Sequence, residues 1–186
     1  MKYFKLFFLS TLLISFLSCS DDDEDTPPID TTSLIGTWTA VSLDADIDLN
    51  GSFSIIDIES STNTVGENFD YELTFTETGY TVTGSYDLVT TGTVNDEPFT
   101  DTTSITDVSE TGTYSLDGNT ITVNGGLYEL GVDEVDLSDI LAEQTGEISF
   151  NSNGELVVRQ NIDQTVNEQG IALATKIDAT TVWKRK

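Results

Sequence analysis

The residues best suited to chemistry lie in the acidic run Asp46-Ile47-Asp48-Leu49-Asn50-Gly51, which Asp57 follows at the twelfth position. Side-chain oxygens at positions one, three and five, with glycine at position six, are typical of the loop that binds calcium between two helices. Asp46, Asp48, Asn50 and Asp57 are therefore candidate ligands of a structural calcium ion. The twelfth residue of such a loop is usually glutamate, and both flanks look like strands, so an acidic turn between strands is the alternative.

The residue types that most enzymes use for acid–base or nucleophilic chemistry are scarce in this chain. It has no histidine, the commonest general base, and a single cysteine, Cys19. No serine or threonine stands beside an activating base in a recognisable motif, and 33 acidic residues make any one carboxylate pair uninformative. Glycines occur singly apart from Gly125-Gly126, so no phosphate-binding loop is indicated. We therefore expect a protein that is not an enzyme and has no cofactor other than the calcium ion.

Cys19 has the sequence context of a lipid attachment site. Lys2 and Lys5 precede the apolar run Leu6–Leu17, which is shorter than the ~20 residues needed to span a bilayer. This pattern predicts a signal peptide over residues 1–18. Phe16-Leu17-Ser18-Cys19 resembles the lipobox of bacterial lipoproteins, and the resemblance implies that Cys19 becomes the lipidated N-terminus. The alternative is a buried cysteine in an uncleaved segment.

The acidic run that follows the cysteine, Asp21–Asp25, is similar to the surface-export signal of Bacteroidota lipoproteins. That resemblance implies an outer-membrane protein, held by its lipid anchor and displayed at the cell surface. A solvated spacer is the alternative interpretation of the same run. Residues 19–32, with their acids and prolines, predict a disordered tether, and residues 33–186 have the length of one domain with one core.

The net charge of −26 at pH 7 becomes −28 after loss of residues 1–18, because that segment holds two lysines and no acid. A polyanion of this strength repels nucleic acid and disfavours self-association, so we expect a monomer that does not bind nucleic acid.

The domain residues predict β-structure throughout. Apolar and polar side chains alternate over Tyr71–Phe75 and Tyr80–Leu88, which gives each strand one apolar face. Three stretches place an aromatic residue four positions before a glycine, as is typical of hairpins with a positive-φ turn residue: Phe75–Thr83, Tyr114–Val123 and Phe150–Val158. Residues 132–143 have helical spacing and predict one short helix, with a structured loop as the alternative.

Antiparallel strands joined in sequence order by hairpins bury one face most simply by closing into a barrel. The length allows about eight to ten strands in an all-β, up-and-down barrel, with a β-sandwich as the alternative.

The domain opens with Leu34-Ile35-Gly36-Thr37-Trp38 and closes with Thr181-Val182-Trp183-Lys184-Arg185. Gly36-Thr37-Trp38 resembles the G-x-W signature of lipocalins, and the arrangement is similar to the lipocalin-like domain of Bacteroidota lipoproteins. The resemblance implies that Trp38 closes the bottom of the barrel and that Arg185 covers its ring through a cation–π contact.

The same resemblance implies a barrel that holds a small apolar ligand. The inward candidates for lining it are Leu73, Phe75, Tyr80, Val82 and Tyr86, with the tyrosine hydroxyls orienting the ligand. The alternative is a filled barrel without a cavity, which binds glycan or protein through surface loops, with Thr90–Glu110 as the candidate loop face. A third interpretation is an acid-rich coat protein with no specific ligand.

Overall fold

The computed structural model describes residues 28–53, 56–130, 143–168 and 171–186. The predicted signal peptide, Cys19 and most of the predicted tether lie outside these residues, as does the predicted helix apart from Glu143. Within the described ranges, no helix is both long enough and apolar enough to cross a membrane.

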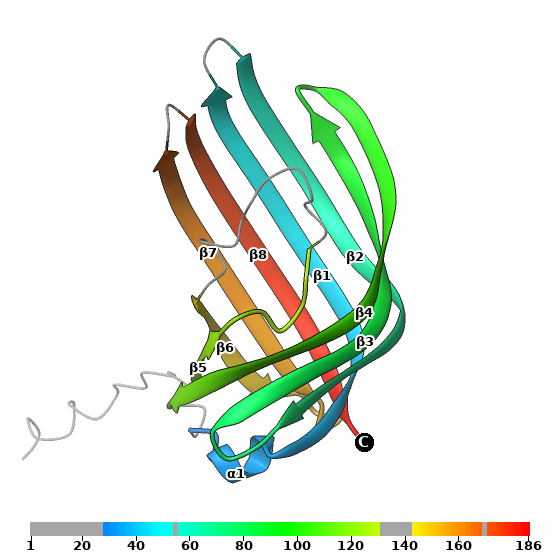
Figure 1. The fold of residues 1–186 in the computed structure, drawn as a ribbon, viewed down its shortest axis with the longest axis vertical. Coiled ribbons are helices and arrows are strands. Elements are labelled where there is room, and N and C mark those ends of the chain that lie inside the picture. Colours follow the sequence, from blue (N-terminus) through cyan, green and yellow to red (C-terminus); the bar gives the residue numbers. More distant parts are fainter. Residues whose placement is uncertain (1–27, 54–55, 131–142, 169–170) are drawn as a thin grey trace, which may run out of the picture.

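The described residues form a closed barrel of eight antiparallel strands, in which each strand pairs with the next in the chain and β8 pairs with β1 (Figure 1). The all-β, up-and-down barrel predicted from the sequence is therefore confirmed. The elements are α1 (Thr31–Leu34), β1 (Gly36–Phe53), β2 (Ile56–Phe75), β3 (Gly79–Val94), β4 (Glu97–Asp117), β5 (Thr120–Asn124), β6 (Glu143–Phe150), β7 (Leu156–Glu168) and β8 (Ile171–Arg185).

The strands differ in length, and this divides the barrel into two parts. Strand β4 has 21 residues, but β5 has 5 and β6 has 8. Strand β5 therefore pairs with β4 only over Thr113–Asp117, and β6 pairs with β7 only over Leu156–Arg159. We call the end near α1 the bottom. Above β5 and β6 the described wall consists of β7, β8, β1, β2, β3 and β4, as Figure 1 shows.

The bottom of the barrel includes residues that the sequence assigned to the tether. Asp30 caps α1 by accepting a hydrogen bond from the Thr32 N–H (2.9 Å), and the Ile29 N–H donates to Asn119 Oδ1 (2.9 Å). Ile29 packs against the core, and Leu34 is fully buried. Residues 29–32, which the sequence assigned to the tether, are therefore attached to the bottom of the barrel by the Ile29 side chain and by this cap.

The three hairpins predicted from aromatic–glycine spacing are present as β2–β3, β4–β5 and β6–β7. Gly118 (φ +61°) and Gly154 (φ +75°) have the expected positive φ. Gly79 does not, and glycine is needed there because a Cβ would lie 2.9 Å from the Gly112 carbonyl oxygen.

The loop face predicted at Thr90–Glu110 is wrong, because these residues belong to the β3–β4 hairpin. Its turn is made by Asn95 (φ +50°) and Asp96 (φ +64°), residue types that tolerate the left-handed conformation. The threonines and valines that flank the turn favour strands.

Candidate functional site

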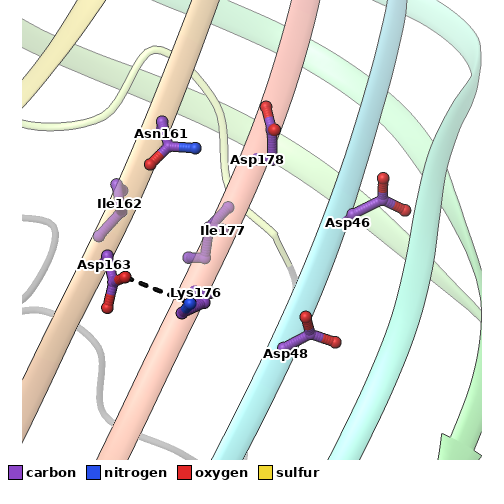
Figure 2. A pocket seen from close by; sticks show the side chains of 8 residues that line it. All are labelled: Asp46, Asp48, Asn161, Ile162, Asp163, Lys176, Ile177 and Asp178. Atoms are coloured by element: carbon purple, nitrogen blue, oxygen red, sulfur yellow. Dashed lines mark ion pairs between the residues drawn. The ribbon is translucent and has the colours of Figure 1, made fainter.

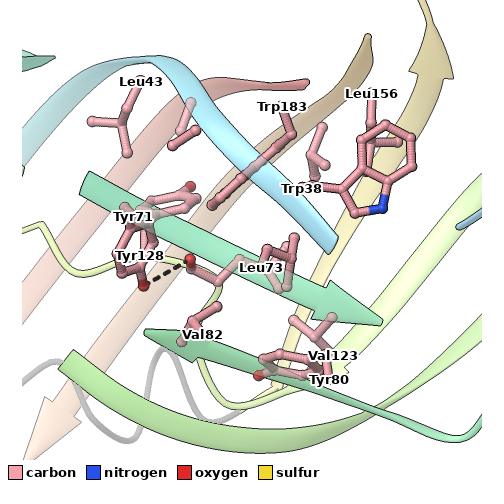
Figure 3. Close-up of a cluster of buried hydrophobic side chains, with 14 of the residues drawn as sticks. Trp38, Leu43, Tyr71, Leu73, Tyr80, Val82, Val123, Tyr128, Leu156 and Trp183 are labelled. Carbon is pink, nitrogen blue, oxygen red and sulfur yellow. Dashed lines mark hydrogen bonds between the residues drawn. The ribbon is translucent and has the colours of Figure 1, made fainter. Parts of the chain in front are cut away.

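The five residues predicted to line a ligand all lie inside the barrel. Leu73, Phe75, Tyr80, Val82 and Tyr86 are each at most 3% exposed and belong to one hydrophobic cluster. The same cluster includes both tryptophans, and Figure 3 shows how the side chains converge from several strands. The structure therefore brings these residues together, as alternation along β2 and β3 predicted.

A segment that sequence reasoning missed packs among them. We call Gly125–Leu130, which follows β5, the strap. Its apolar side chains are buried, with Leu127 0% and Leu130 6% exposed. Tyr71 Oη donates a hydrogen bond to the Leu127 carbonyl oxygen (3.2 Å). The hydroxyl of Tyr86 makes two hydrogen bonds, donating to Glu129 O and accepting from Glu129 N, each at 2.7 Å. Tyrosines on the barrel wall therefore hold the strap by its backbone.

The third wall tyrosine makes the same kind of contact at the start of the strap. The Tyr80 hydroxyl lies within donating distance of the carbonyl oxygens of Asn124 (3.3 Å) and Gly126 (3.4 Å). Gly125 has φ +106°, and a Cβ there would lie 3.0 Å from Tyr80 Oη, so glycine lets the chain pass close to the wall. The signal in the sequence was Gly125-Gly126 followed by apolar Leu127, Tyr128 and Leu130.

The strap also joins a buried polar chain. Tyr128 Oη donates to Gln160 Oε1, and Gln160 Nε2 donates to Gln144 Oε1 at 2.9 Å. Gln144 and Gln160 are 4% and 2% exposed, so both amides are removed from water and paired with each other. Burial raises the pKa of each of Tyr71, Tyr86 and Tyr128 well above the usual range of a tyrosine, so these hydroxyls remain protonated.

The upper part of the interior holds other polar groups. The hydroxyls of Thr64 and Thr90 are hydrogen-bonded to each other at 2.9 Å. Thr175 is fully buried on β8, and its Oγ1 has no hydrogen-bond partner among the described residues.

At the bottom of the barrel, the Arg185 guanidinium carbon lies 4.4 Å from the centroid of the Trp38 ring. The guanidinium also donates to the carbonyl oxygens of Ile35 (Nη1, 3.1 Å) and Ser33 (Nη2). Phe150 stacks on Trp38, with centroids 6.0 Å apart. The structure thus places the two residues of the predicted closure in contact with each other.

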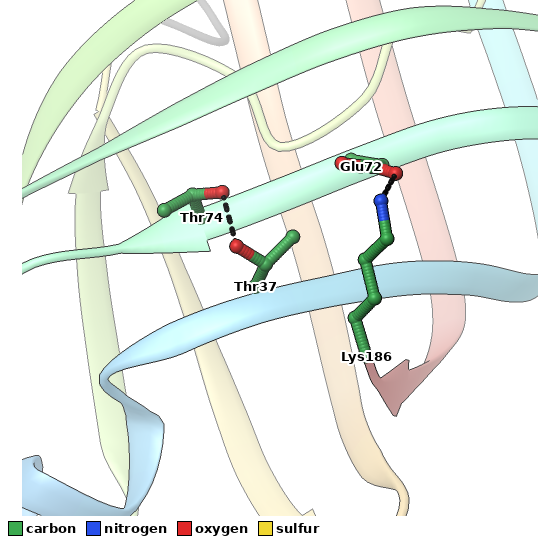
Figure 4. Close-up of polar contacts among 4 residues, drawn as sticks. All are labelled: Thr37, Glu72, Thr74 and Lys186. Carbon is green, nitrogen blue, oxygen red and sulfur yellow. Dashed lines mark hydrogen bonds and ion pairs between the residues drawn. The ribbon is translucent and has the colours of Figure 1, made fainter.

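The last residue ties the C-terminus to the neighbouring wall, as Figure 4 shows. Lys186 Nζ lies 2.6 Å from Glu72 Oε1, and this hydrogen bond raises the pKa of Lys186. Beside it, the Thr37 and Thr74 hydroxyls of β1 and β2 are 3.0 Å apart.

The predicted calcium loop is not formed. Asp46, Asp48 and Asn50 lie along β1, and Asp57 lies on β2 opposite Ser52. Side chains two residues apart on a strand are separated by roughly 6.7 Å, whereas Ca²⁺ needs its oxygens at about 2.3–2.6 Å. Among the described residues, no group of three or more acidic, histidine or cysteine side chains is arranged to hold a metal ion. Asp46, Asp48 and Asn50 therefore lie in a strand rather than in a loop, because Ile47 and Leu49 pack against the core and keep the chain extended.

Asp46 and Asp48 instead line a shallow pocket of about 440 Å³ on the outer face of β7, β8 and β1 (Figure 2). Across β1 and β8, Asp46 lies opposite Asp178 and Asp48 lies opposite Lys176. Across β8 and β7, Asp163 also lies opposite Lys176, and the two side chains form an ion pair at 3.4 Å. The side chains and backbone that line this acidic face come from Asp46, Asp48, Asn161, Ile162, Asp163, Lys176, Ile177 and Asp178. Four carboxylates there face one ammonium group, so the acidic face is anionic.

Comparisons with models of protein families, with curated proteins and with solved structures each find no match to this chain. The functional interpretation therefore comes from the geometry of the chain itself.

Proposed function

We propose that this protein is a lipid-anchored cell-envelope protein whose filled barrel is a rigid scaffold for binding a partner at its outer surface. One observation carries the proposal. The hydroxyls of Tyr80 and Tyr86, which were the candidates for orienting a ligand, instead contact the backbone of the strap, at Gly126 and Glu129.

The strength of these contacts argues against a ligand at that position. A ligand there would have to displace Leu127, Tyr128 and Leu130, and each large apolar side chain loses about 1.5–3 kcal/mol when it leaves the core. The hydrogen bonds from the wall tyrosines contribute about 1 kcal/mol each. A small apolar molecule would need to replace all of these contacts, so surface binding is the better-supported function.

The anchor supports a position close to the membrane. The lipobox resemblance implies a lipid on Cys19 and an outer-membrane location at the cell surface. The described domain begins at Pro28, and the nine intervening steps along the chain span at most about 30 Å. The barrel would therefore be held near the membrane, in a position to meet a protein or a glycan there. The strong negative charge supports a monomer that does not bind nucleic acid.

A carrier of a small apolar molecule, as the lipocalin resemblance implies, is the second candidate. The observation that favours it lies in the upper wall, where Leu49 and Ile162 are only partly buried. A ligand in that part of the barrel would not have to displace the hydrogen bonds of the strap.

Two measurements on the full-length protein test the proposal. In a Gram-negative host fed an alkyne-labelled fatty acid, we expect the wild type to carry the label in the outer-membrane fraction and Cys19→Ser to lack it. Label on Cys19→Ser would contradict the anchor. The detergent-purified protein is then titrated with Nile red, a neutral apolar dye. Saturable binding of one dye per chain would contradict the filled scaffold and support the carrier.

A further inference from the structure

We infer that the edge of β7 over residues Gln160–Glu168, which has no paired strand on one side among the described residues, accepts an added β-strand from a partner peptide in which basic and apolar residues alternate. This inference rests on the proposed surface-binding function and names the site and the chemistry of the partner.

The edge exists because the pairing of β6 with β7 ends at Arg159. Strand β7 pairs with β8 over its whole length, from Leu156 to Glu168. On its other side the pairing with β6 ends at the pair Glu147 and Arg159, and the remaining residues of β6 pair only with β5, although the Gln144 side chain still bonds to Gln160. From Gln160 onward, β7 therefore has no strand partner on that side among the described residues, and Figure 1 shows it at the margin of the upper sheet. An unpaired edge presents backbone N–H and C=O groups that pair with a further strand.

The opposite margin of the upper sheet, β4 from Glu97 to Gly112, is unpaired by β5 in the same way but is protected. Pro98 lacks an N–H donor, and Asp107 has a positive φ (+57°) where one extra β4 residue interrupts the pairing with β3. Prolines and bulges are the usual means by which proteins prevent strand addition. Residues 160–168 contain no proline, and their register with β8 is uninterrupted. The β7 edge is thus the receptive one.

Charge on the outer face of the barrel specifies the outward-pointing residues of the partner peptide. Asn161 and Asp163 point outward from β7, and Asp178 lies beside Asn161 on β8. Outward side chains of an added strand would lie about 5 Å from those of β7, where opposite charges attract. Asp163 already pairs with Lys176, but both side chains are about two-thirds exposed, so a second ammonium can approach the acidic face. Lysine or arginine is therefore favoured at the outward positions.

The inner face of the barrel specifies the inward-pointing residues of the partner peptide. Gln160 and Ile162 point inward from β7, and Ile162 packs against the core but is only partly buried. Inward side chains of an added strand would extend this surface, so apolar, β-branched residues are favoured there. A second copy of this chain does not fit, because it would bring Asp163 of one copy toward the same anionic face of the other.

The test uses the full-length protein in neutral detergent and the acetylated, amidated peptide (Lys-Val)4-Lys. We expect saturable binding, with slowed amide hydrogen exchange confined to residues 160–168. A peptide of the same composition, with its lysines and valines in two blocks, is the control for general attraction to a polyanion. Equal binding of the block peptide, no slowing at residues 160–168, or slowing on β4 instead would each overturn the inference.

Paired variants test the charge argument. The double variant Asp163→Asn, Asp178→Asn is expected to weaken peptide binding by roughly threefold to tenfold, because it removes the cross-strand attraction to Asp163 and the longer-range attraction to Asp178, which lies one strand further away on β8. The matched control Glu77→Gln, Asp117→Asn removes the same charge from exposed turns at the bottom, and we expect less than a twofold change there. Equal weakening by both doubles would overturn the site.

The outcomes separate this inference from the proposed function. Protection elsewhere on the outside of the barrel would overturn the β7 site and leave surface binding in place. Saturable Nile red binding would instead overturn the filled scaffold, whatever the peptide does. A dimer in sedimentation experiments, with residues 160–168 protected without peptide, would overturn the assignment of the edge to a partner peptide.

Discussion

Replacing Tyr86 by phenylalanine removes one oxygen atom and tests whether wall hydroxyls hold the strap. Tyr86 is 2% exposed, and its hydroxyl lies 2.7 Å from both the N and the O of Glu129. The substitution keeps the ring and breaks two hydrogen bonds. Each contributes about 1 kcal/mol, so we expect the free energy of unfolding to fall by about 2 kcal/mol.

For a domain of this size, that loss corresponds to a Tm lower by about 4–8 °C. Urea unfolding followed by tryptophan fluorescence measures the loss in the free energy of unfolding directly. Tyr114→Phe is the matched control, since its hydroxyl makes a single hydrogen bond to Thr76 O (2.7 Å) at an exposed site, and we expect a loss below about 1 kcal/mol. If the two variants are equally destabilised, the wall hydroxyls do not hold the strap as described.

Three other predictions concern the closure, the backbone and the pH response. Arg185→Ala is expected to lower Tm more than Lys184→Ala, because only the former loses the Trp38 contact and two carbonyl hydrogen bonds; equal shifts would contradict the closure. Gly84→Ala is expected to prevent folding, since its Cβ would lie 1.9 Å from a carbonyl oxygen at φ +123°, whereas Gly118→Ala meets no atom within 4 Å and should cost only about 1 kcal/mol in circular-dichroism melts. Burial raises the pKa of Tyr86 in the folded state, so its contribution to stability is complete below its ordinary pKa of about 10 and is lost as the pH rises above that. Tyrosinate absorbance should therefore appear together with alkaline unfolding, and titration of all the tyrosines without unfolding would refute this.

The barrel was predictable because its signals are local. Alternation along Tyr71–Phe75 defines the inner face, and the turns at Gly118 and Gly154 depend on residues adjacent in sequence. The contact between Arg185 and Trp38 came from a family resemblance, since nothing local links two residues at opposite ends of the domain.

The features that sequence reasoning did not foresee depended on tertiary context. The spacing of Asp46, Asp48 and Asn50 matches a calcium loop, but Ile47 and Leu49 between them are drawn into the core and extend the chain. The strap was missed because its hydrogen bonds join residues more than thirty positions apart, such as Tyr86 and Glu129. The edge of β7 that is unpaired among the described residues depends on where its pairing with β6 stops, which strand composition does not specify.

The central claim is that the barrel interior is filled by the chain itself, and native mass spectrometry of the full-length protein, purified from the envelope of its host, tests it most directly. We predict the mass of the lipidated polypeptide alone, unchanged between native and denaturing conditions. A stoichiometric additional mass of small-molecule size that is present in the native spectrum and lost on denaturation would contradict the filled scaffold and identify the protein as a carrier.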